Sequence, residues 1–411
     1  MAGAPTSPKS ELLAIADAQA RLLDGVAPVE AETVALAEAN RRVLAEDLVA
    51  TRTQPPFAAS AMDGYAVRHA DLALDVALRL VGEAPAGRAF AGTVDAGECV
   101  RIFTGAPLPA GADTVLIQED AAVAADGGIR PTEIPAPGRN VRAAGLDFAA
   151  GDRLLRAGQR LDYRALALAA AMNHATIPVR RRPRVAILAT GDELVEPGAT
   201  PRPDQIVASN AHAIAALVED LGGTPLPLGI APDRADVIAA RAVAAVEARA
   251  DVLVTLGGAS VGDHDLVQRA LAGEGLQLGF WKIAMRPGKP LMSGRLGPTR
   301  VLGLPGNPVS SLVTAILFLK PLLRALLAEP TLFDPEREAI LAGDLKPNDR
   351  RQDYLRARIV DWRDGLPVVE PLALQDSSML SSFAAADCLI VRPPNAPALA
   401  AGAGCRIVLL G

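Results

Sequence analysis

Three loops rich in glycine and proline lie among acidic and basic side chains in the middle of the chain. The loops read GGASVGDHD (257–265), RPGKP (286–290) and GLPGNPVSS (303–311). The charged residues on or between them are Asp263, Asp265, Lys282, Arg286 and Lys289. Because glycine has no Cβ, the backbone of such loops can approach a ligand closely and donate N–H groups to an anion. One such loop would be an ordinary turn, but three in succession predict an enzyme site for a phosphorylated substrate.

Further acidic residues follow two predicted strands. Asp192 and Glu193 come after the apolar run 185–189, and Asp233 comes after the run 224–228. Since the carboxyl ends of parallel strands meet at one edge of a sheet, we expect these carboxylates to face the same crevice as the glycine loops. They could hold Mg²⁺, which prefers a few oxygen ligands together with substrate phosphates. They could also accept N–H groups from a heterocycle, or cap helices at Asp192 and Asp233.

Glycine and serine residues in two of the loops could bind phosphate oxygens near the start of a helix. The first set is Gly257, Gly258, Ser260 and Gly262, and the second is Gly306, Asn307 and Ser310. Ser310 could be a helix cap or an oxyanion ligand. Neither loop is a GxGxxG or Walker A motif, so neither identifies a nucleotide by itself. The glycine loops and the charged residues around them predict phosphoryl or adenylyl transfer assisted by magnesium rather than acyl transfer.

The loops are positioned by strands and helices that alternate regularly from residue 184 to residue 327. This alternation predicts a doubly wound, mostly parallel α/β domain. Before it, apolar spacing predicts helices at 11–23, 30–45 and 163–173, with strand-like runs inserted between the second and the third. After it, further strand-like runs predict a β barrel or sandwich. The expected domains are a discontinuous helical domain (1–50 and 146–180), an inserted β domain (51–145), the α/β domain (181–330) and the C-terminal β domain (331–411).

Four residues outside the α/β domain could contribute polar groups to a site. Asp63 lies in a tight turn, and Thr104 belongs to a Thr-Gly turn after a strand-like run. Arg142 and Asp147 lie on the irregular connection that leaves the inserted β domain. A turn and a solvent-exposed arginine are the ordinary interpretations. The functional alternatives are a carboxylate presented from a loop and an Arg–Asp pair that faces an anion.

Composition excludes several classes of protein. A formal net charge of −6 argues against general nucleic-acid binding, which needs a basic face. The three cysteines have no CxxC spacing, so a structural zinc site is not expected. The N-terminus resembles no signal peptide, and the most lipid-like stretch, Val309–Leu319, is too short to span a bilayer and predicts a core helix. These features predict a soluble cytoplasmic protein.

The motifs together resemble one known family. They are SAMDGYA (60–66), RIFTGAPLP (101–109), TGDEL (190–194), GGASVGDHD, RPGKP and GLPGNPVSS, and they follow one another in the family's order over nearly the whole chain. The family is that of the molybdopterin molybdenumtransferases, which includes MoeA and the gephyrin E domain. The resemblance implies a central domain of the molybdopterin-binding type. It also implies the last step of molybdenum cofactor synthesis, in which adenylated molybdopterin, molybdate and a divalent cation react and AMP is released.

The resemblance also implies roles for individual residues. The implied catalytic residues are Asp63, Thr104, Asp147, Glu193, Asp265 and Lys282, and Asp233 is the implied magnesium ligand. The implied substrate-binding residues are Arg142, Asp192, Gly257, Gly258, Ser260, Gly262, Arg286, Lys289, Gly306, Asn307, Ser310, Arg351, Arg356, Ser378 and Ser382. Among them, Arg286, Lys289 and Ser310 are similar to an oxyanion pocket for molybdate.

Two departures and two alternatives accompany this interpretation. Many relatives have Lys in place of Arg286, and the connection between Arg142 and Asp147 is less charged than is common in the family. The alternatives are an adenylyltransferase of the preceding step and a scaffold that binds peptides. The resemblance further implies a homodimer with a composite site, and contacts with the preceding adenylyltransferase and with recipient molybdoenzymes. Molybdate and tungstate are too similar in size and shape for the sequence to separate them.

Overall fold

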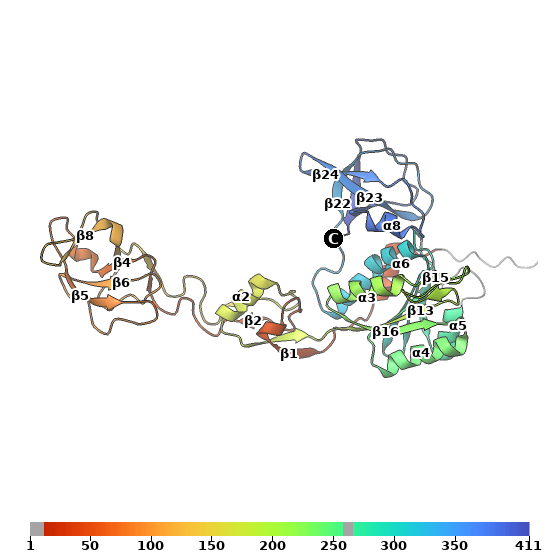
Figure 1. Ribbon diagram of the computed structural model, residues 1–411, viewed down its shortest axis with the longest axis horizontal. Helices are drawn as coiled ribbons and strands as arrows, with labels where there is room; N and C mark the ends of the chain where they lie inside the picture. The colour runs from red at the N-terminus through yellow and green to blue at the C-terminus, as the bar shows by residue number, and fades with distance from the viewer. Residues whose placement is uncertain (1–11, 258–265, 411) are drawn as a thin grey trace, which may run out of the picture. The chain divides into compact units, whose positions relative to one another are not determined.

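The computed structural model describes residues 12–257 and 266–410 and divides into two compact units (Figure 1). The first unit comprises Met1–Glu32, Arg41–Ala45 and Val179–Gly411, and the second comprises Thr33–Asn40 and Glu46–Pro178. The first therefore contains the α/β domain together with the C-terminal β domain. The second contains the inserted β domain and the segments that flank it.

A six-stranded mixed sheet forms the centre of the α/β domain. Its strand order is β16 (Thr224–Ala231), β13 (Arg184–Thr190), β17 (Val252–Leu256), β21 (Thr299–Leu304), β20 (Met292–Leu296) and β18 (Gln277–Trp281). The first four strands are parallel, and β20 and β18 are antiparallel to their neighbours. The predicted doubly wound, mostly parallel sheet is confirmed. Strand β20 was not predicted, because its Ser293 and Gly294 interrupt the apolar run.

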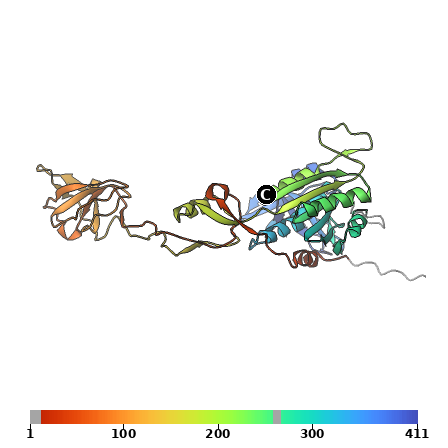
Figure 2. The ribbon, with the colours of Figure 1, turned by 90° about the horizontal axis from the view of Figure 1, so that it is seen from below.

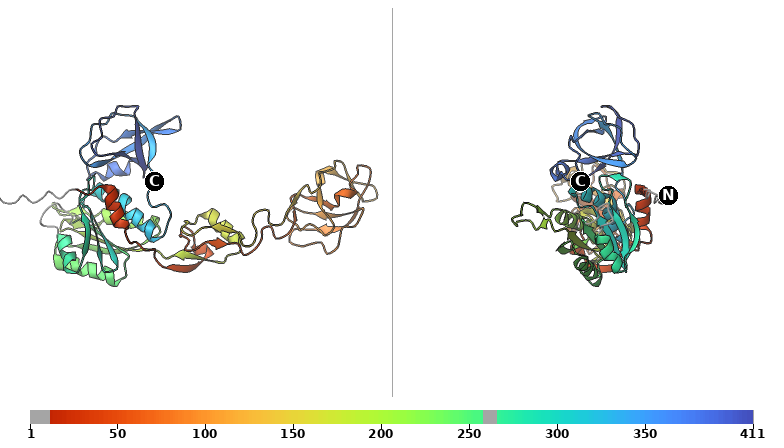
Figure 3. Two further views of the ribbon diagram at one scale, coloured as in Figure 1. Left: turned by 180° about the vertical axis from the view of Figure 1, so that it is seen from behind. Right: turned by 90° about the vertical axis from the view of Figure 1, so that its right-hand side faces the viewer.

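Helices cover both faces of this sheet, because alternate residues of the central strands point in opposite directions. One face packs against α3 (Asn210–Asp220), α1 (Ile15–Leu23) and a long helix built from α6 (Pro308–Thr314), the π-helical turn η4 (Ala315–Leu319) and α7 (Lys320–Leu326). The other face packs against α4 (Ala235–Glu247) and α5 (Leu266–Gly273). Figure 3 shows α1 beside the long helix. The central strands, buried on both faces, are accordingly apolar throughout.

The long helix is a core element, as the sequence predicts. The span Pro308–Leu326 is long and apolar enough to cross a membrane, but 67% of its apolar window is buried inside the protein. Val313, Phe318 and Leu322 have no exposed surface and belong to the main apolar cluster of the α/β domain. Burial of this kind is typical of a core helix rather than a membrane span.

Two predictions for the N-terminal region are wrong. The helix expected at 11–23 forms as α1, but it packs on α7 and β18 of the α/β domain rather than on the helix near residue 163. The helix expected at 30–45 does not form. That segment contains strand β1 (Ala31–Ala35), paired with β12 (Thr176–Arg180), and a 3₁₀ turn, η1 (Leu36–Glu38). Its apolar spacing suits a helix, but pairing with a distant strand outweighs that local preference.

Arg300 fixes the end of α1 to the sheet. Its side chain is nearly buried, and its two Nη atoms donate to the carbonyl oxygens of Leu22 and Asp24 at 2.8 and 2.9 Å. Burial lowers the pKa of Arg300 to about 10. These carbonyls at the C-terminal end of α1 have no helical N–H partner, so the arginine serves as their cap.

We expect Arg300→Met to destabilise the first unit by about 1–3 kcal/mol, because the buried carbonyl group of Leu22 would lose a charged donor. The carbonyl oxygen of Asp24 would keep its bond from Arg295. Urea denaturation followed by circular dichroism measures this change. Arg337→Met, at an exposed position of the C-terminal domain, is the matched control. A loss no larger than that of the control would show that α1 is held by its apolar face alone.

The second unit contains the inserted β domain. Its main sheet has the order β5 (Arg79–Ala84), β6 (Glu98–Ile102), β4 (Gly64–Val67) and β7 (Thr114–Ile117), accompanied by the hairpin of β8 (Ala121–Val123) and β9 (Ile129–Pro131). The chain enters and leaves beside itself, since β3 (Ala59–Ser60) pairs with β10 (Val141–Arg142). The flanking segments pair as β2 (Leu48–Val49) with β11 (Arg153–Leu155). Helix α2 (Tyr163–Ala171) follows, capped by Asp162.

The C-terminal domain is a small β barrel, as predicted. Its strands are β22 (Arg337–Leu341), β23 (Gln352–Arg363), β24 (Leu366–Pro371), β25 (Cys388–Arg392) and β26 (Gly404–Leu409), and helix α8 (Leu380–Ala384) lies between β24 and β25. Pairing of β23 with both β24 and β25 closes the sheet, which removes exposed edges. Strand β19 (Met285–Arg286), which belongs to the RPGKP loop, adds to the start of β23. The barrel is thereby joined to the α/β domain beside the candidate site.

Candidate functional site

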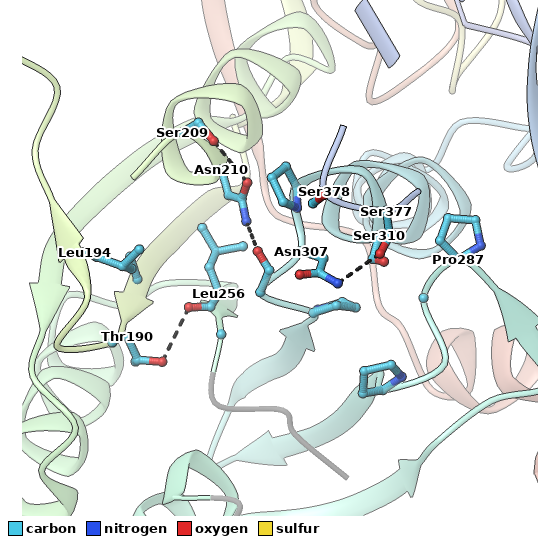
Figure 4. A pocket seen from close by; sticks show the side chains of 18 of the residues that line it. Thr190, Leu194, Ser209, Asn210, Leu256, Pro287, Asn307, Ser310, Ser377 and Ser378 are labelled. Atoms are coloured by element: carbon cyan, nitrogen blue, oxygen red, sulfur yellow. Dashed lines mark hydrogen bonds between the residues drawn. The ribbon is translucent and has the colours of Figure 1, made fainter. Parts of the chain in front are cut away.

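A cleft of about 1320 Å³ lies at the carboxyl ends of the parallel strands, where the sequence predicts a ligand crevice. Its floor comes from residues that follow β13, β17 and β21, and one wall comes from the start of α3 (Figure 4). A second wall is formed by the segment that carries the short strands β14 (Leu194–Val195) and β15 (Ile206–Val207), which projects from the α/β domain (Figure 2). The loop 375–378 of the barrel domain closes the far side.

Glycines allow the floor of the cleft to be built from closely spaced backbone. Gly257 has φ +94°, and a Cβ there would lie 2.7 Å from the carbonyl oxygen of Thr190. Gly288, in the RPGKP loop, has φ +106°, and a Cβ would lie 2.4 Å from a methyl group of Thr314. Both positions therefore require glycine. The loops that follow neighbouring strands can consequently pack together, and polar side chains reach the cleft from their flanks.

One end of the cleft is acidic. Glu193 and Asp233 line it, and Asp192 lies behind them, where its Oδ1 accepts the backbone N–H of Asp233 at 3.1 Å. Burial raises the pKa of Asp233, and the negative charges of Asp192 and Glu193 raise it further. Within residues 12–257 and 266–410, no three histidine, cysteine, aspartate or glutamate side chains lie close enough together to hold a metal ion by themselves. A cation at Asp233 would therefore depend on water or substrate oxygens.

The opposite end carries the positive charges. Arg286, Lys289 and Arg351 line it, and Arg269 reaches the cleft from α5. Arg286 is paired with Asp353, and Arg351 is paired with Asp349. Lys289 is half-buried, and the described part of the chain gives its ammonium group no carboxylate partner. Lys289 is therefore available for an anion that enters the cleft.

The long helix begins at the basic end. Pro308 has no N–H, and the N–H of Val309 donates to the carbonyl oxygen of Ser377 at 3.0 Å, so among the described first-turn donors the N–H of Ser310 remains for a bound anion. Ser310, 5% exposed, lines the cleft at this end. Asn307 donates to the hydroxyl of Ser377 at 2.9 Å, and Asn210 donates to the carbonyl oxygen of Gly306 at 2.7 Å (Figure 4). These two side chains hold the loop before the helix against α3 and against the barrel.

The cleft brings together ten of the residues singled out in the sequence. They are Glu193, Asp233, Gly257, Arg286, Lys289, Gly306, Asn307, Ser310, Arg351 and Ser378. It also contains residues that no motif indicated, namely Asn210, Arg269, Gln375, Asp376 and Ser377. Asn210 could have been suspected from its place before an apolar helical pattern. The others carry no signal in the sequence.

Besides Asp192, three predicted residues of the first unit do not line the cleft. The ammonium of Lys282 lies 3.9 Å from the centroid of the Trp281 ring. Arg356 is buried and donates to the carbonyl oxygens of Leu374 and Asp376, so it supports the loop 375–378 instead of facing a ligand. Ser382 donates to the carbonyl oxygen of Leu374. The packing of the surrounding helices and loops sets the orientation of these three side chains. No short sequence motif predicts it. Gly258, Ser260, Gly262 and Asp265 lie outside the described residues.

Four predicted residues belong to the second unit. Asp63 Oδ1 accepts the backbone N–H and the hydroxyl of Thr104, each at 2.8 Å, and these bonds lower the pKa of Asp63. Beside them, the Arg101 guanidinium lies 5.0 Å from the centroid of the Tyr65 ring. Arg142 and Asp147 are exposed, on β10 and on the turn after it. Asp63 and Thr104 therefore form one pair, and no bond joins Arg142 to Asp147 in the described chain.

We expect Thr104→Val to raise the pKa of Asp63 only part of the way to an ordinary value, because the backbone N–H remains as donor after the hydroxyl is removed. A carboxyl ¹³C NMR titration measures the shift. Thr114→Val is the matched control, because it removes a hydroxyl that donates to Asp113 at 2.8 Å. An unchanged titration of Asp63 in Thr104→Val would mean that the backbone bond alone holds the carboxylate ionised.

Three family models match the chain in succession. The model described as "MoeA N-terminal region (domain I and II)" matches residues 13–173, the "Probable molybdopterin binding domain" matches residues 186–325, and the "MoeA C-terminal region (domain IV)" matches residues 338–410. The order and extent of these matches cover most of the chain. They confirm the resemblance that the motifs indicated.

Curated relatives share much of the sequence. The molybdopterin molybdenumtransferase of Haemophilus influenzae is 36% identical over 382 residues, which cover 92% of this chain and 94% of the relative. That of Bacillus subtilis is 33% identical over 390 residues, with coverage of 93% and 90%. Two crystal structures of the MoeA protein from Pyrococcus horikoshii align with TM-scores of 0.85 and 0.82 at 29% and 28% identity. They cover 98% and 97% of this chain and all of each structure, which confirms the fold class.

Proposed function

The chain belongs to the molybdopterin molybdenumtransferase family, whose members are enzymes of molybdenum cofactor biosynthesis, and we propose that it inserts molybdenum from molybdate into adenylated molybdopterin with release of AMP. The observation that supports this proposal is the division of one cleft into an acidic end and a basic end. Adenylated molybdopterin carries phosphates and an amino-substituted heterocycle. Molybdate is a tetrahedral dianion. The two ends of the cleft suit these different groups.

The basic end is the proposed site for oxyanions. Lys289 supplies a positive charge that no carboxylate in the described chain balances, and Ser310 supplies a hydroxyl at the start of the long helix. Arg286 and Arg351 supply further N–H donors. Groups of this kind stabilise negative charge that develops as a phosphoanhydride bond breaks. They would therefore bind molybdate, a substrate phosphate, or both in turn.

The acidic end is the proposed site for Mg²⁺. Asp233 lines the cleft, and Asp192 and Glu193 add negative charge near it, which is the environment that a divalent cation stabilises. When bound, Mg²⁺ would neutralise charge on the phosphates of the substrate. Asp233 would hold the ion, and Glu193 would orient the substrate or accept an N–H from its heterocycle.

The proposed assembly is a cytoplasmic homodimer with a composite site. Asp63 and Thr104, to which the resemblance assigns catalytic roles, belong to the second unit, and the cleft belongs to the first. In this proposal the β domain of one subunit supplies Asp63 to the cleft of the other. Partners that supply adenylated molybdopterin or receive the finished cofactor would bind the same dimer.

The proposal is tested by incubating the purified protein with adenylated molybdopterin, MgCl₂ and molybdate. AMP release is followed by chromatography, and the product is assayed by reconstitution of an apo-molybdoenzyme. We expect AMP release that requires molybdate, together with a reconstituted enzyme. Tight binding of the adenylated substrate without turnover, with either molybdate or tungstate, would instead point to a carrier and would overturn the proposed reaction.

A further inference from the structure

Arg286 is bound by a buried carboxylate at the point where the RPGKP loop joins the barrel. Strand β19 pairs in parallel with the start of β23, and this register places Arg286 opposite Asp353. The Nε and Nη2 atoms of Arg286 donate to the two carboxylate oxygens of Asp353 at 3.0 and 2.5 Å. The Asp353 side chain is 3% exposed and that of Arg286 is 46% exposed. One edge of the guanidinium is thus fixed while the rest is accessible from the cleft.

A second carboxylate extends this arrangement to Arg351. Asp349 accepts from Nη2 and Nε of Arg351 at 2.8 and 3.2 Å, and it lies 3.6 Å from Nη1 of Arg286. The hydrogen bonds from Arg351 hold the pKa of Asp349 well below its usual range. Two guanidinium groups and two carboxylates therefore cancel in formal charge at the rim of the cleft. Lys289 adds the positive charge that remains.

The balance of charges at the rim of the cleft affects which anion the cleft binds best. Attraction between unbalanced charges depends on charge and distance, so it draws every tetrahedral dianion, including sulfate and phosphate. Fixed N–H donors discriminate more sharply, because an anion of the wrong size leaves a donor unpaired. An arginine bound along one edge presents the remaining N–H groups of its planar guanidinium in a fixed orientation. A lysine at the same position could offer only a point charge.

We propose that Asp353 is a positioning residue that sets the oxyanion selectivity of the cleft, by fixing the orientation of Arg286 and balancing its charge. Asp349 assists by holding Arg351 in the same way. The inference rests on the proposed function, because it takes molybdate to be the anion that binds beside Arg286. It assigns Asp353 no contact with the substrate, since its carboxylate oxygens are buried and already bonded.

The test compares oxyanion affinities in the wild type and in Asp353→Asn, which keeps the size of the side chain and removes its charge. We expect sulfate affinity to rise and the ratio of molybdate to sulfate affinity to fall roughly tenfold, since one nearby negative charge is lost and Arg286 is released. Isothermal titration with molybdate and sulfate separately measures the ratio. Sulfate should also become a stronger inhibitor of AMP release.

Three further variants test whether the loss of selectivity is due to the charge of Asp353 and its bond to Arg286. Asp353→Glu restores the carboxylate and should recover most of the selectivity. Asp361→Asn makes the same charge change on an exposed part of β23, outside the cleft, and should leave the ratio unchanged. Arg286→Lys keeps the positive charge but loses the paired hydrogen bonds, so its effect on selectivity should not add to that of Asp353→Asn. This variant also tests the inference should Asp353→Asn fail to fold.

The inference is overturned by a folded Asp353→Asn protein whose affinity ratio equals that of the wild type, or by selectivity losses in Arg286→Lys and Asp353→Asn that simply add. The proposed function fails in a different way, namely through a wild-type protein that releases no AMP in response to molybdate. Because oxyanion affinities are measured without turnover, the two failures are distinguishable.

Discussion

Lys289→Ala is expected to reduce kcat/KM for molybdate-dependent AMP release by about two orders of magnitude, the usual effect of removing one charged group that stabilises an oxyanion. Within the described chain, the Lys289 ammonium has no carboxylate partner, whereas Arg286 and Arg351 are both paired. The backbone at Lys289 is held in place, because its carbonyl oxygen accepts the N–H groups of Ile283 and Leu291 at 3.0 and 3.1 Å. Its charge is therefore the main free attraction at the basic end.

Steady-state kinetics with varied molybdate measures the effect of this substitution. Lys346→Ala, which removes an exposed lysine of the barrel outside the cleft, is the matched control and should behave like the wild type. Lys289→Arg should recover part of the activity, because it restores the charge with a different donor geometry. Activity in Lys289→Ala comparable with that of the control would remove Lys289 from the oxyanion pocket.

Asp233→Asn is expected to have opposite effects on the metal-free and the magnesium-bound protein. Without metal, the ionised Asp233 is disfavoured by burial and by the charges of Asp192 and Glu193, so its neutral replacement should raise the melting temperature. With Mg²⁺, the wild type should gain stability because the ion binds only the folded state, and the variant should lose that gain. AMP release should fall with the loss of the ion.

The raised pKa of Asp233 also determines how the stability of the metal-free protein depends on pH. The folded pKa of Asp233 is raised, so between its ordinary and its raised value the folded state holds more protons than the unfolded state. The contribution of Asp233 to stability therefore falls as pH rises through this window, and the loss is complete above the raised pKa. Calorimetry with and without MgCl₂ measures both effects. Asp220→Asn, an exposed aspartate at the end of α3, is the control, and a variant that still responds to Mg²⁺ would remove Asp233 as the ligand.

The sequence alone determined the architecture of the α/β domain and the place of its cleft. Strands such as β13, β17 and β21 are covered on both faces, so their composition is apolar in any sequence that folds this way. Gly257 and Gly288 occupy positions that tolerate no side chain, so the glycines in the sequence already indicate where the backbone packs closely. The preference for helix or strand and the need for glycine are properties of short segments, so they can be predicted from the sequence of each segment.

Only the tertiary structure decided which side chains meet. Residues 30–45 suit a helix by spacing, yet β1 forms there because a strand 140 or so residues away offers hydrogen bonds. The resemblance implies a substrate-binding role for Arg356, yet burial turns its guanidinium to the backbone of a loop. Asp353 has no motif of its own, yet it binds Arg286, which lies 67 positions earlier in the chain. Such contacts depend on the packing of separate domains, and packing is a property of the whole fold rather than of any one segment.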